Sequence, residues 1–250
     1  MNTTTTRLTA RAAMIIGGSR GIGAAVARRL ASEGADVAFT YRDGAEAAAA
    51  LVAEIEAAGR RALAIRADSA DATAVHSAVD TAADQFGRLD VLVINAALYP
   101  VAPIDEIGLE EFDRTIAVNV RGPFVAATAA ARHLTDGGSI VTIGSNVAER
   151  MPFPGLGLYT LSKTALVGLT KGLARDLGGR GIRANLVHPG PTDTELNPAD
   201  GPYADTIRSF TALGRYAEPA EIAATVAHLA SDDARYITGA SLMVDGGFTV

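Results

Sequence analysis

The chain has 250 residues, of which 48% are hydrophobic and 20% are charged, and it contains no cysteine. A chain of this length and composition can bury a large core, and the lack of cysteine excludes disulfides, thiolate nucleophiles and Cys-ligated metals. The formal net charge of -6 offers no basic surface for nucleic acid or anionic membrane, so small-molecule chemistry is favoured. The histidines lack the spacing of metal ligands and no metal site is expected; they are His76, His133, His188 and His228.

The amino-terminal residues 1–11 are polar and rich in threonine. They contain no apolar core of a signal peptide, and no run of about 18 apolar residues follows them. We therefore expect a flexible tail over residues 1–11, no membrane span and a cytoplasmic protein.

The predicted elements alternate along the chain between short apolar runs typical of strands and longer segments of helical period. The predicted strands span residues 12–16, 37–41, 62–66, 91–94, 139–143, 182–187 and 241–244, and the predicted helices lie near 21–33, 44–58, 71–86, 109–134, 156–178 and 218–230. Strict alternation, with strands that are apolar on both faces, predicts a parallel sheet covered by helices on both sides. The predicted fold is a single doubly wound α/β domain over residues 12–250 with a seven-stranded parallel sheet.

A glycine-rich segment follows the first predicted strand and leads directly into a helix. Glycines allow a tight turn and close approach of the backbone to a pyrophosphate, while the free N–H groups and the positive dipole end of the helix attract the anion. A strand, a glycine cluster and a helix in one βαβ unit predict a dinucleotide site. The predicted cofactor-binding residues of this segment are Gly17, Ser19, Arg20, Gly21, Ile22 and Gly23.

The end of the second predicted strand indicates which dinucleotide binds. This strand ends in Thr40, Tyr41 and Arg42. Arg42, together with Arg20, can form charge-assisted bonds to a 2′-phosphate, which favours NADP(H). The alternative is NAD(H), because Asp43 lies about twenty residues past the glycine loop, near the spacing of an acid that binds the ribose 2′-hydroxyl.

Ser145 and the pair formed by Tyr159 and Lys163 are the strongest signal for catalysis. If the Tyr159 segment is helical, the i,i+4 spacing places the phenol and the ammonium on one face, about 6 Å apart along the axis. A free tyrosine titrates near pH ~10, and an ammonium about 6 Å away contributes roughly 2.8 kcal/mol at an effective dielectric of about 20, or about two pKa units. We therefore expect Lys163 to lower the pKa of Tyr159, the candidate proton donor, with Ser145 hydrogen-bonding the same substrate oxygen.

Further motifs occur in a characteristic order along the chain. After the glycine loop come Asp68-Ser69, Asn95-Ala96-Ala97, Asn119-Val120-Arg121-Gly122, Ser145, Tyr159-x-x-x-Lys163, Pro189-Gly190 with Thr194, and Asp245-Gly246-Gly247. On these motifs the chain resembles the short-chain dehydrogenase/reductase family from about residue 12 to the C-terminus. The resemblance implies a Rossmann fold.

The resemblance also implies roles for particular residues. Asn119 would join Ser145, Tyr159 and Lys163 in the catalytic set and hold a water that relays protons from Lys163. Lys163 would also bind the nicotinamide ribose. The cofactor-binding residues that the motifs add to the glycine loop and Arg42 are Tyr41, Asp68, Ser69, Asn95, Ala96, Ala97, Tyr159, Lys163, Pro189, Gly190, Thr192 and Thr194.

The substrate pocket is expected to be mostly apolar, which suits a neutral ketone or aldehyde. The Pro- and Gly-rich stretch 189–202 is too long for an ordinary turn and predicts a lid or binding loop. The interval from Ser145 to Tyr159 is one residue longer than in many family members, which should reshape the wall at 152–154. The side chains expected around the substrate are Leu98, Tyr99, Val147, residues 151–153, Leu196, Tyr203 and Ile207.

These features together predict an NADP(H)-dependent oxidoreductase that transfers hydride between nicotinamide and a ketone or secondary alcohol. The chain is most similar to the 3-oxoacyl-carrier-protein reductase branch, whose members dock an acidic carrier protein with basic residues; Arg180 could serve, but segment 134–138 lacks such a residue. The alternatives are a free carbonyl reductase, an NAD-dependent secondary-alcohol dehydrogenase and a non-catalytic NADP(H)-binding regulator. The resemblance also implies a homotetramer that pairs the helices at 109–134 and 156–178.

Overall fold

Seven parallel strands form one sheet in the computed structural model, which describes residues 6–250. The strands are β1 Ala12–Ile16, β2 Asp36–Tyr41, β3 Ala62–Arg66, β4 Leu89–Ile94, β5 Leu134–Ile143, β6 Arg183–Pro189 and β7 Ser241–Val244. Their order across the sheet is β3-β2-β1-β4-β5-β6-β7, and every neighbouring pair is parallel. The predicted doubly wound fold with a seven-stranded parallel sheet is confirmed.

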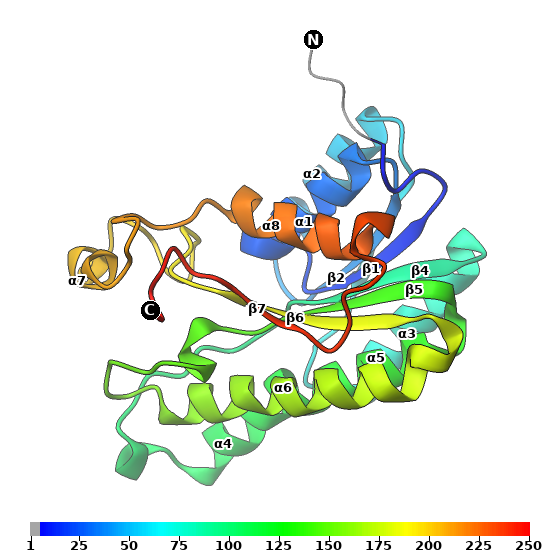
Figure 1. Ribbon diagram of the computed structural model, residues 1–250. Coiled ribbons are helices and arrows are strands. Elements are labelled where there is room, and N and C mark those ends of the chain that lie inside the picture. The colour runs from blue at the N-terminus through cyan, green and yellow to red at the C-terminus, as the bar shows by residue number, and fades with distance from the viewer. Residues whose placement is uncertain (1–5) are drawn as a thin grey trace.

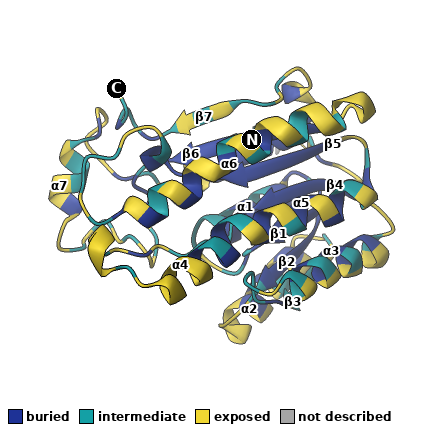
Figure 2. Ribbon diagram, turned by 90° about the horizontal axis from the view of Figure 1, so that it is seen from below, coloured by how far each residue is buried: buried dark blue, intermediate teal, exposed yellow. Residues whose placement is uncertain are grey.

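Helices cover both faces of this sheet (Figure 1). They are α1 Gly21–Ser32, α2 Ala45–Ala57 and α8 Pro219–Ala230 on one side, and α3 Ala72–Phe86, α5 Gly122–His133 and α6 Gly157–Leu177 on the other. Successive side chains of a strand point to opposite faces, so Ala13 and Ile15 of β1 pack with α1, α2 and α8, whereas Met14 and Ile16 pack with α3 and α5. Figure 2 shows the exposed sides of α3, α5 and α6 turned away from the buried strands.

The predicted helix at 109–134 consists of three consecutive segments. These are α4 Leu109–Ile116, a π-helical turn Ala117–Arg121, and α5. Asn119 lies in the π-helical turn, a kind of irregularity that often marks a functional site. A short helix that the sequence did not predict, α7 Ala204–Ser209, follows the stretch 189–202.

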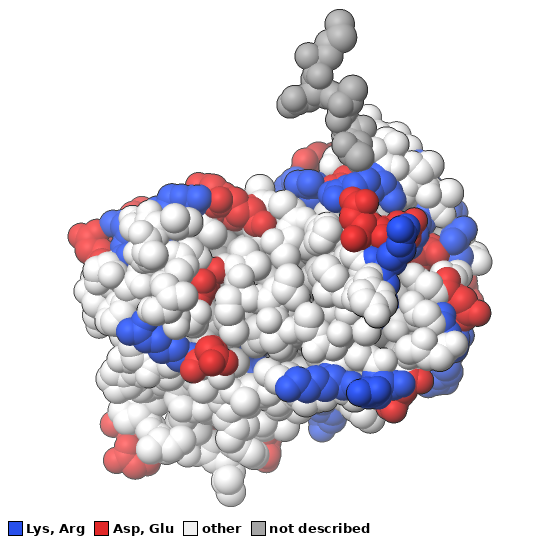
Figure 3. Space-filling view, viewed as in Figure 1, with Lys and Arg blue, Asp and Glu red and all other residues white. Residues whose placement is uncertain are grey.

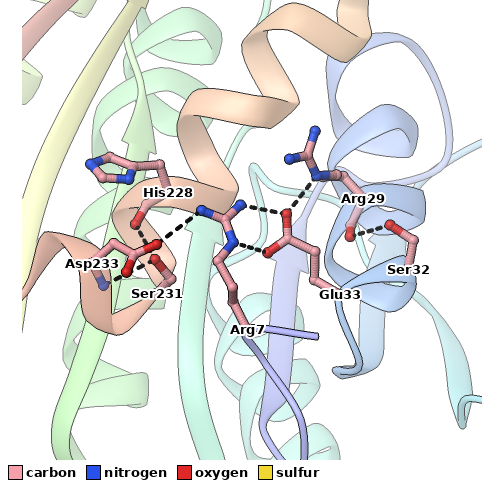
Figure 4. A network of polar contacts seen from close by, with 7 residues as sticks. All are labelled: Arg7, Arg29, Ser32, Glu33, His228, Ser231 and Asp233. Atoms are coloured by element: carbon pink, nitrogen blue, oxygen red, sulfur yellow. Dashed lines mark hydrogen bonds and ion pairs between the residues drawn. The ribbon is translucent and has the colours of Figure 1, made fainter. Parts of the chain in front are cut away.

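Part of the amino-terminal segment packs against the domain (Figure 4). Leu8 has no exposed surface, and the Arg7 guanidinium contacts the Glu33 carboxylate at 2.6 Å and the Asp233 carboxylate at 3.3 Å. Arg29 also contacts Glu33, at 2.6 Å, so one carboxylate joins the segment to the end of α1. Residues 1–5 of the expected tail lie outside the described residues, and residues 7–11 differ from that expectation because they are anchored.

Basic and acidic side chains are interspersed around the margin of the face in Figure 3, with a broad uncharged area between them. This mixture gives that face no field of one sign to attract a polyanion. No helix among residues 6–250 combines the length and the hydropathy that a membrane span needs.

Candidate active site

A cavity of about 350 Å³ lies where the carboxyl ends of the central strands meet. The strand order reverses at β1 and β4, and ligands of doubly wound sheets bind at such a point. The structure brings most of the predicted site residues together on the cavity wall; they are Gly17, Ser19, Arg20, Gly21, Ile22, Tyr41, Arg42, Asp68, Ser69, Asn95, Ala96, Ala97, Ser145, Tyr159, Lys163, Pro189, Gly190, Thr192 and Thr194. Gly23 and Asn119 lie behind this wall.

The glycine loop is built so that backbone fits where a side chain would not. A Cβ atom on Gly23 would lie 2.1 Å from the Gly17 carbonyl oxygen, and one on Gly18 would lie 2.4 Å from Cβ of Phe39. Gly17 itself has a positive φ of 82° and donates its N–H to Thr40 Oγ1 at 2.8 Å. The loop is therefore fixed by β2, and it leads into α1, whose amino end has no side-chain cap. The residues present fit a pyrophosphate, because uncapped N–H groups and the helix dipole favour an anion there.

Asn95 holds the other side of the glycine loop. Its Nδ2 donates to the Gly17 carbonyl oxygen at 2.7 Å, which links the end of β4 to the end of β1. At the end of β3, Asp68 accepts a bond from the Ala70 N–H at 2.9 Å, so its carboxylate is oriented by the turn that follows. Both side chains therefore have a local structural bond in addition to their position on the cavity wall.

Three arginines surround Asp43 at the end of the cavity beside β2. The Arg42 Nε lies 2.6 Å from the Asp43 carboxylate and holds the pKa of that carboxyl below its usual value; Arg66 and Arg20 act in the same direction. Arg20 also lies 3.7 Å from Glu195, across the mouth of the cavity. Arg66 is the last residue of β3. The sequence did not predict it as a site residue, because its only pattern there is that of a strand. Guanidinium groups that lie close together can bind a phosphate through charge-assisted hydrogen bonds.

Ser145, Tyr159 and Lys163 meet at the opposite end of the cavity. Ser145 follows β5, and both Tyr159 and Lys163 lie in the first two turns of α6, as the spacing predicted. The Lys163 ammonium lies 5.8 Å from the centre of the Tyr159 ring and donates to the Ile143 carbonyl oxygen at 2.9 Å. Tyr99 packs edge-on against the Tyr159 ring, with 4.8 Å between ring centres. The phenol is thus held between a cation, a hydroxyl and an aromatic ring.

Burial is the main cause of the pKa shifts of Tyr159 and Lys163. It raises the pKa of the Tyr159 phenol well above its ordinary value, while the Ser145 hydroxyl acts in the opposite direction and Tyr99 adds to the rise. Burial also lowers the pKa of Lys163 to about 8. The expectation that Lys163 lowers the phenol pKa is wrong for the protein alone, because removal of water favours the neutral form of both groups. Tyr159 accordingly keeps its proton at neutral pH.

Asn119 is bonded to the chain on both sides of its amide. Its Oδ1 accepts from the Leu98 N–H at 2.8 Å, and its Nδ2 donates to the Leu98 carbonyl oxygen at 2.9 Å and to Ser162 Oγ at 3.0 Å. Asn119 is 1% exposed. These bonds fix the segment after β4 against α6. Asn119 therefore has a positioning role that the sequence did not predict.

Apolar side chains close the cavity beside Ser145 and Tyr159. The expected Leu98, Tyr99, Val147, Phe153, Leu196 and Ile207 lie on the wall, while Met151, Pro152 and Tyr203 do not. Phe248, from the C-terminal segment, also lies on the wall and packs with Phe153, 6.2 Å between ring centres. Arg150 donates to the Phe248 carbonyl oxygen at 2.7 Å and fixes this segment. No local signal in the sequence points to Phe248, because the contact joins distant parts of the chain.

Comparison with known proteins agrees with this geometry. The model of the family described as "Enoyl-(Acyl carrier protein) reductase" matches residues 16–249. The structure of a short chain dehydrogenase from Burkholderia cenocepacia in complex with NADP is 54% identical in sequence, with a TM-score of 0.97, and the match covers 98% of this chain and 100% of that one. The chain belongs to the short-chain dehydrogenase/reductase family.

Curated members of this family carry different names. A cyclic-di-GMP-binding biofilm dispersal mediator protein of Escherichia coli is 43% identical, over 96% of this chain and 98% of that protein. A 3-oxoacyl-[acyl-carrier-protein] reductase of Synechocystis is 38% identical, over 98% of this chain and 99% of that protein. The predicted resemblance to the family is confirmed, and the divergent names of these members leave the substrate to be argued from this chain's own site.

Proposed function

We propose that this short-chain dehydrogenase/reductase is an NADP(H)-dependent oxidoreductase that interconverts a ketone and a secondary alcohol, with Tyr159 as the proton donor. The observation that supports the proposal most is the convergence of Ser145, Tyr159 and Lys163 in the same cavity as the glycine loop. Each of the three side chains has a structural explanation when taken alone. A buried phenol, a hydroxyl and a buried ammonium around one apolar cavity have a chemical explanation together.

The protein's task in ketone reduction is to hold the carbonyl and supply one proton. When bound, reduced nicotinamide supplies the hydride. The Ser145 hydroxyl donates a hydrogen bond to the carbonyl oxygen, and the Tyr159 phenol transfers its proton to the same oxygen as negative charge develops there. The Lys163 ammonium stabilises the phenolate that remains. With its pKa raised by burial, the Tyr159 phenol carries its proton at neutral pH, as a proton donor must.

NADP(H) fits the residues around the cavity better than NAD(H). Arg20, Arg42 and Arg66 lie close enough to lower the pKa of Asp43 together, and a 2′-phosphate would take the place that this carboxylate fills among them. Asn95, Asp68 and the glycine loop would hold the rest of the adenosine and the pyrophosphate, with Pro189, Gly190, Thr192 and Thr194 at the nicotinamide. The NADP complex of the Burkholderia relative supports this choice.

Substitution Tyr159→Phe tests the proton donor. We expect turnover to fall by about 10²–10⁴-fold, the usual contribution of a positioned acid, while NADPH affinity stays the same. NADPH oxidation is followed with a panel of ketones and 3-oxoacyl thioesters, and NADPH binding by fluorescence titration. Tyr236→Phe is the matched control, because Tyr236 is fully exposed. Substantial residual activity in Tyr159→Phe would show that the phenol is not the proton donor.

Substitution Arg42→Ala tests the cofactor. The variant should lose affinity for NADPH by about tenfold or more, and much less for NADH, because a charge-assisted bond is worth about 1.5–3 kcal/mol. Arg28→Ala is the control, since Arg28 is exposed and pairs with Glu54 at 2.9 Å instead. Equal losses for both cofactors would refute the assignment of Arg42 to the 2′-phosphate.

The carrier-protein substrate is the less favoured alternative. Arg180 lies before β6, at the edge of the sheet opposite the cavity, where it contacts Asp136 at 3.0 Å and the Ala131 carbonyl oxygen at 2.7 Å. It therefore lies far from the entrance where it was expected. A free ketone with apolar substituents fits the wall formed by Phe153, Leu196 and Phe248.

A second function is supported by the 43% identity with the Escherichia coli mediator protein. In that case the chain would bind NADP(H) without turnover and act as a nucleotide-responsive regulator. The two functions are separated by the substrate panel together with a titration of the NADPH complex with cyclic di-GMP. Displacement of NADPH without turnover of any substrate would favour the regulator.

We also propose a cytoplasmic homotetramer. Phe124 on α5 is 55% exposed and Leu161 on α6 is 51% exposed, and a partner copy would cover these apolar side chains. Ala126, Ala127, Ala129 and Ala130 of α5 would not contribute to this contact, because they are buried within the chain. Light scattering of the wild type against Phe124→Glu tests this association.

A further inference from the structure

The exit of β5, which leads to Ser145, is fixed by three successive backbone groups. The Ile143 carbonyl oxygen accepts from Lys163 Nζ at 2.9 Å, and the Gly144 N–H donates to the Val187 carbonyl oxygen at 2.7 Å. The Ser145 carbonyl oxygen lies 2.7 Å from Nδ1 of His188. The first contact belongs to the catalytic set and the second to the sheet. The third contact comes from the His188 side chain, which has no part in the sheet hydrogen bonds or in the proposed proton transfer.

The distance decides which ring nitrogen of His188 carries hydrogen. A carbonyl oxygen has only lone pairs, so a contact of 2.7 Å requires an N–H at Nδ1. The Ser145 N–H also lies 3.3 Å from Nδ1, but it cannot donate to a nitrogen whose hydrogen already faces the carbonyl. His188 is 1% exposed, and burial lowers its pKa, with Lys163 acting in the same direction and the Ser145 carbonyl and Glu149 against it. The ring is therefore neutral, with its hydrogen on Nδ1.

The residue before Ser145 makes room for this ring. A Cβ atom on Gly144 would lie 2.7 Å from His188 Nδ1 and 3.0 Å from its Cε1. Only a residue without a side chain lets the imidazole lie directly against the backbone at this place. Gly144 and His188 thus form a matched pair at the ends of neighbouring strands, next to the hydroxyl that lies on the cavity wall.

We propose that His188 is a positioning residue for Ser145: its Nδ1–H holds the Ser145 carbonyl group and thereby directs the Ser145 hydroxyl towards the substrate oxygen beside Tyr159. Ser145 has an extended backbone with φ of -164° and ψ of 148°. Besides its interaction with the Tyr159 phenol, its side chain makes two long contacts, 3.4 Å from the Val147 N–H and 3.5 Å from Asn146 Oδ1. Both long contacts lie near the limit of a hydrogen bond, so the position of the Ser145 backbone helps to determine where the hydroxyl points. The inference rests on the proposed function, since it assigns His188 a part in that reaction.

Three substitutions separate the bond from the bulk of the ring. In asparagine the amide nitrogen is attached to Cγ, as Nδ1 is in histidine, whereas the glutamine nitrogen lies one bond farther along the side chain. His188→Asn should keep kcat within about threefold of the wild type. His188→Gln and His188→Leu should lower kcat by about 10- to 100-fold, the loss expected when a catalytic group shifts by about 1 Å. NADPH affinity, measured by fluorescence, should stay within about twofold in all three.

Each outcome decides one hypothesis. If the wild type turns over a ketone and His188→Asn loses as much kcat as His188→Leu, the inference is wrong and the proposed function stands. If the wild type turns over no substrate, the proposed function fails. Should His188→Leu not fold, the comparison of His188→Asn with His188→Gln gives the same answer, because both carry an amide.

Nitrogen NMR of ¹⁵N-histidine-labelled protein tests the bond without cofactor or turnover. The chain has four histidines, and the resonances that disappear in His188→Asn identify the ring. We expect Nδ1 to carry the hydrogen and Nε2 to lack it. A hydrogen on Nε2 alone would overturn the assignment, whatever the kinetic result.

Discussion

Lys163→Met should stabilise the protein at neutral pH although it removes a residue of the proposed active site. Lys163 is 3% exposed, and burial lowers its pKa to about 8 from a usual value near 10.5. Below pH 8 the folded protein therefore carries a buried ammonium that would be better solvated in the unfolded chain. Methionine has a similar shape and no charge, so the variant avoids this cost.

The magnitude follows from the difference in pKa between the folded and unfolded states. A shift of about 2.5 units costs the wild type about 3 kcal/mol at pH 7, and the cost falls to about 2 kcal/mol at pH 9 and to under about 1 kcal/mol at pH 10. The variant also loses the bond to the Ile143 carbonyl oxygen, which offsets about 1–3 kcal/mol at every pH. Between pH 8 and 10.5 the unfolded chain binds more protons than the folded one. The free energy of unfolding of the wild type therefore rises with pH across that window.

Urea unfolding at one protein concentration, repeated from pH 7 to pH 10.5, measures the effect. The free energy of unfolding of Lys163→Met relative to wild type should fall by about 2–3 kcal/mol across this range. Lys171→Met is the matched control, since Lys171 is the other lysine of the chain and is exposed, and its difference from wild type should stay flat. A difference for Lys163→Met that does not change with pH would refute the account of a buried ammonium.

Three further predictions concern catalysis, acid stability and the glycine loop. The kcat of ketone reduction should fall as the pH rises past about 8, because Lys163 loses its proton there, and a flat profile from pH 6 to pH 10 would contradict its role. Burial alone raises the pKa of Asp90, but bonds from Arg88, Ala12 and Thr135 outweigh it and hold that pKa below its usual value. Asp90→Asn should therefore cost about 3 kcal/mol of unfolding free energy at pH 7, with the gap closing as the pH falls below about 4 and the wild type loses the same bonds; an equal gap at both pH values would argue against it. Gly23→Ala should cost about 1–3 kcal/mol and weaken NADPH binding because its Cβ meets the Gly17 carbonyl, and calorimetry showing no loss would contradict the close approach.

The fold and most of the candidate site could be predicted from local sequence patterns. The alternation of strand and helix patterns is local, and it predicted all seven strands, although β5 begins at Leu134 and not at residue 139 as expected. The glycine loop, Ser145 and the pair of Tyr159 and Lys163 also follow from local order, because parallel strands bring their carboxyl ends to one edge. It can therefore be predicted, without knowing how the elements pack, that motifs just after the strands lie close together.

The pKa shifts of the site and the contacts that support it could not be predicted in this way, because they depend on tertiary packing. The direction of the Tyr159 pKa depends on the water removed by every element around it, and the i,i+4 spacing to Lys163 carries no information about that burial. Likewise Phe248 and His188 reach the site from segments far along the chain, through contacts that no local period encodes. A sequence pattern reports which residues share a face of one element; how much solvent a group loses, and which distant backbone it touches, is set by packing between elements.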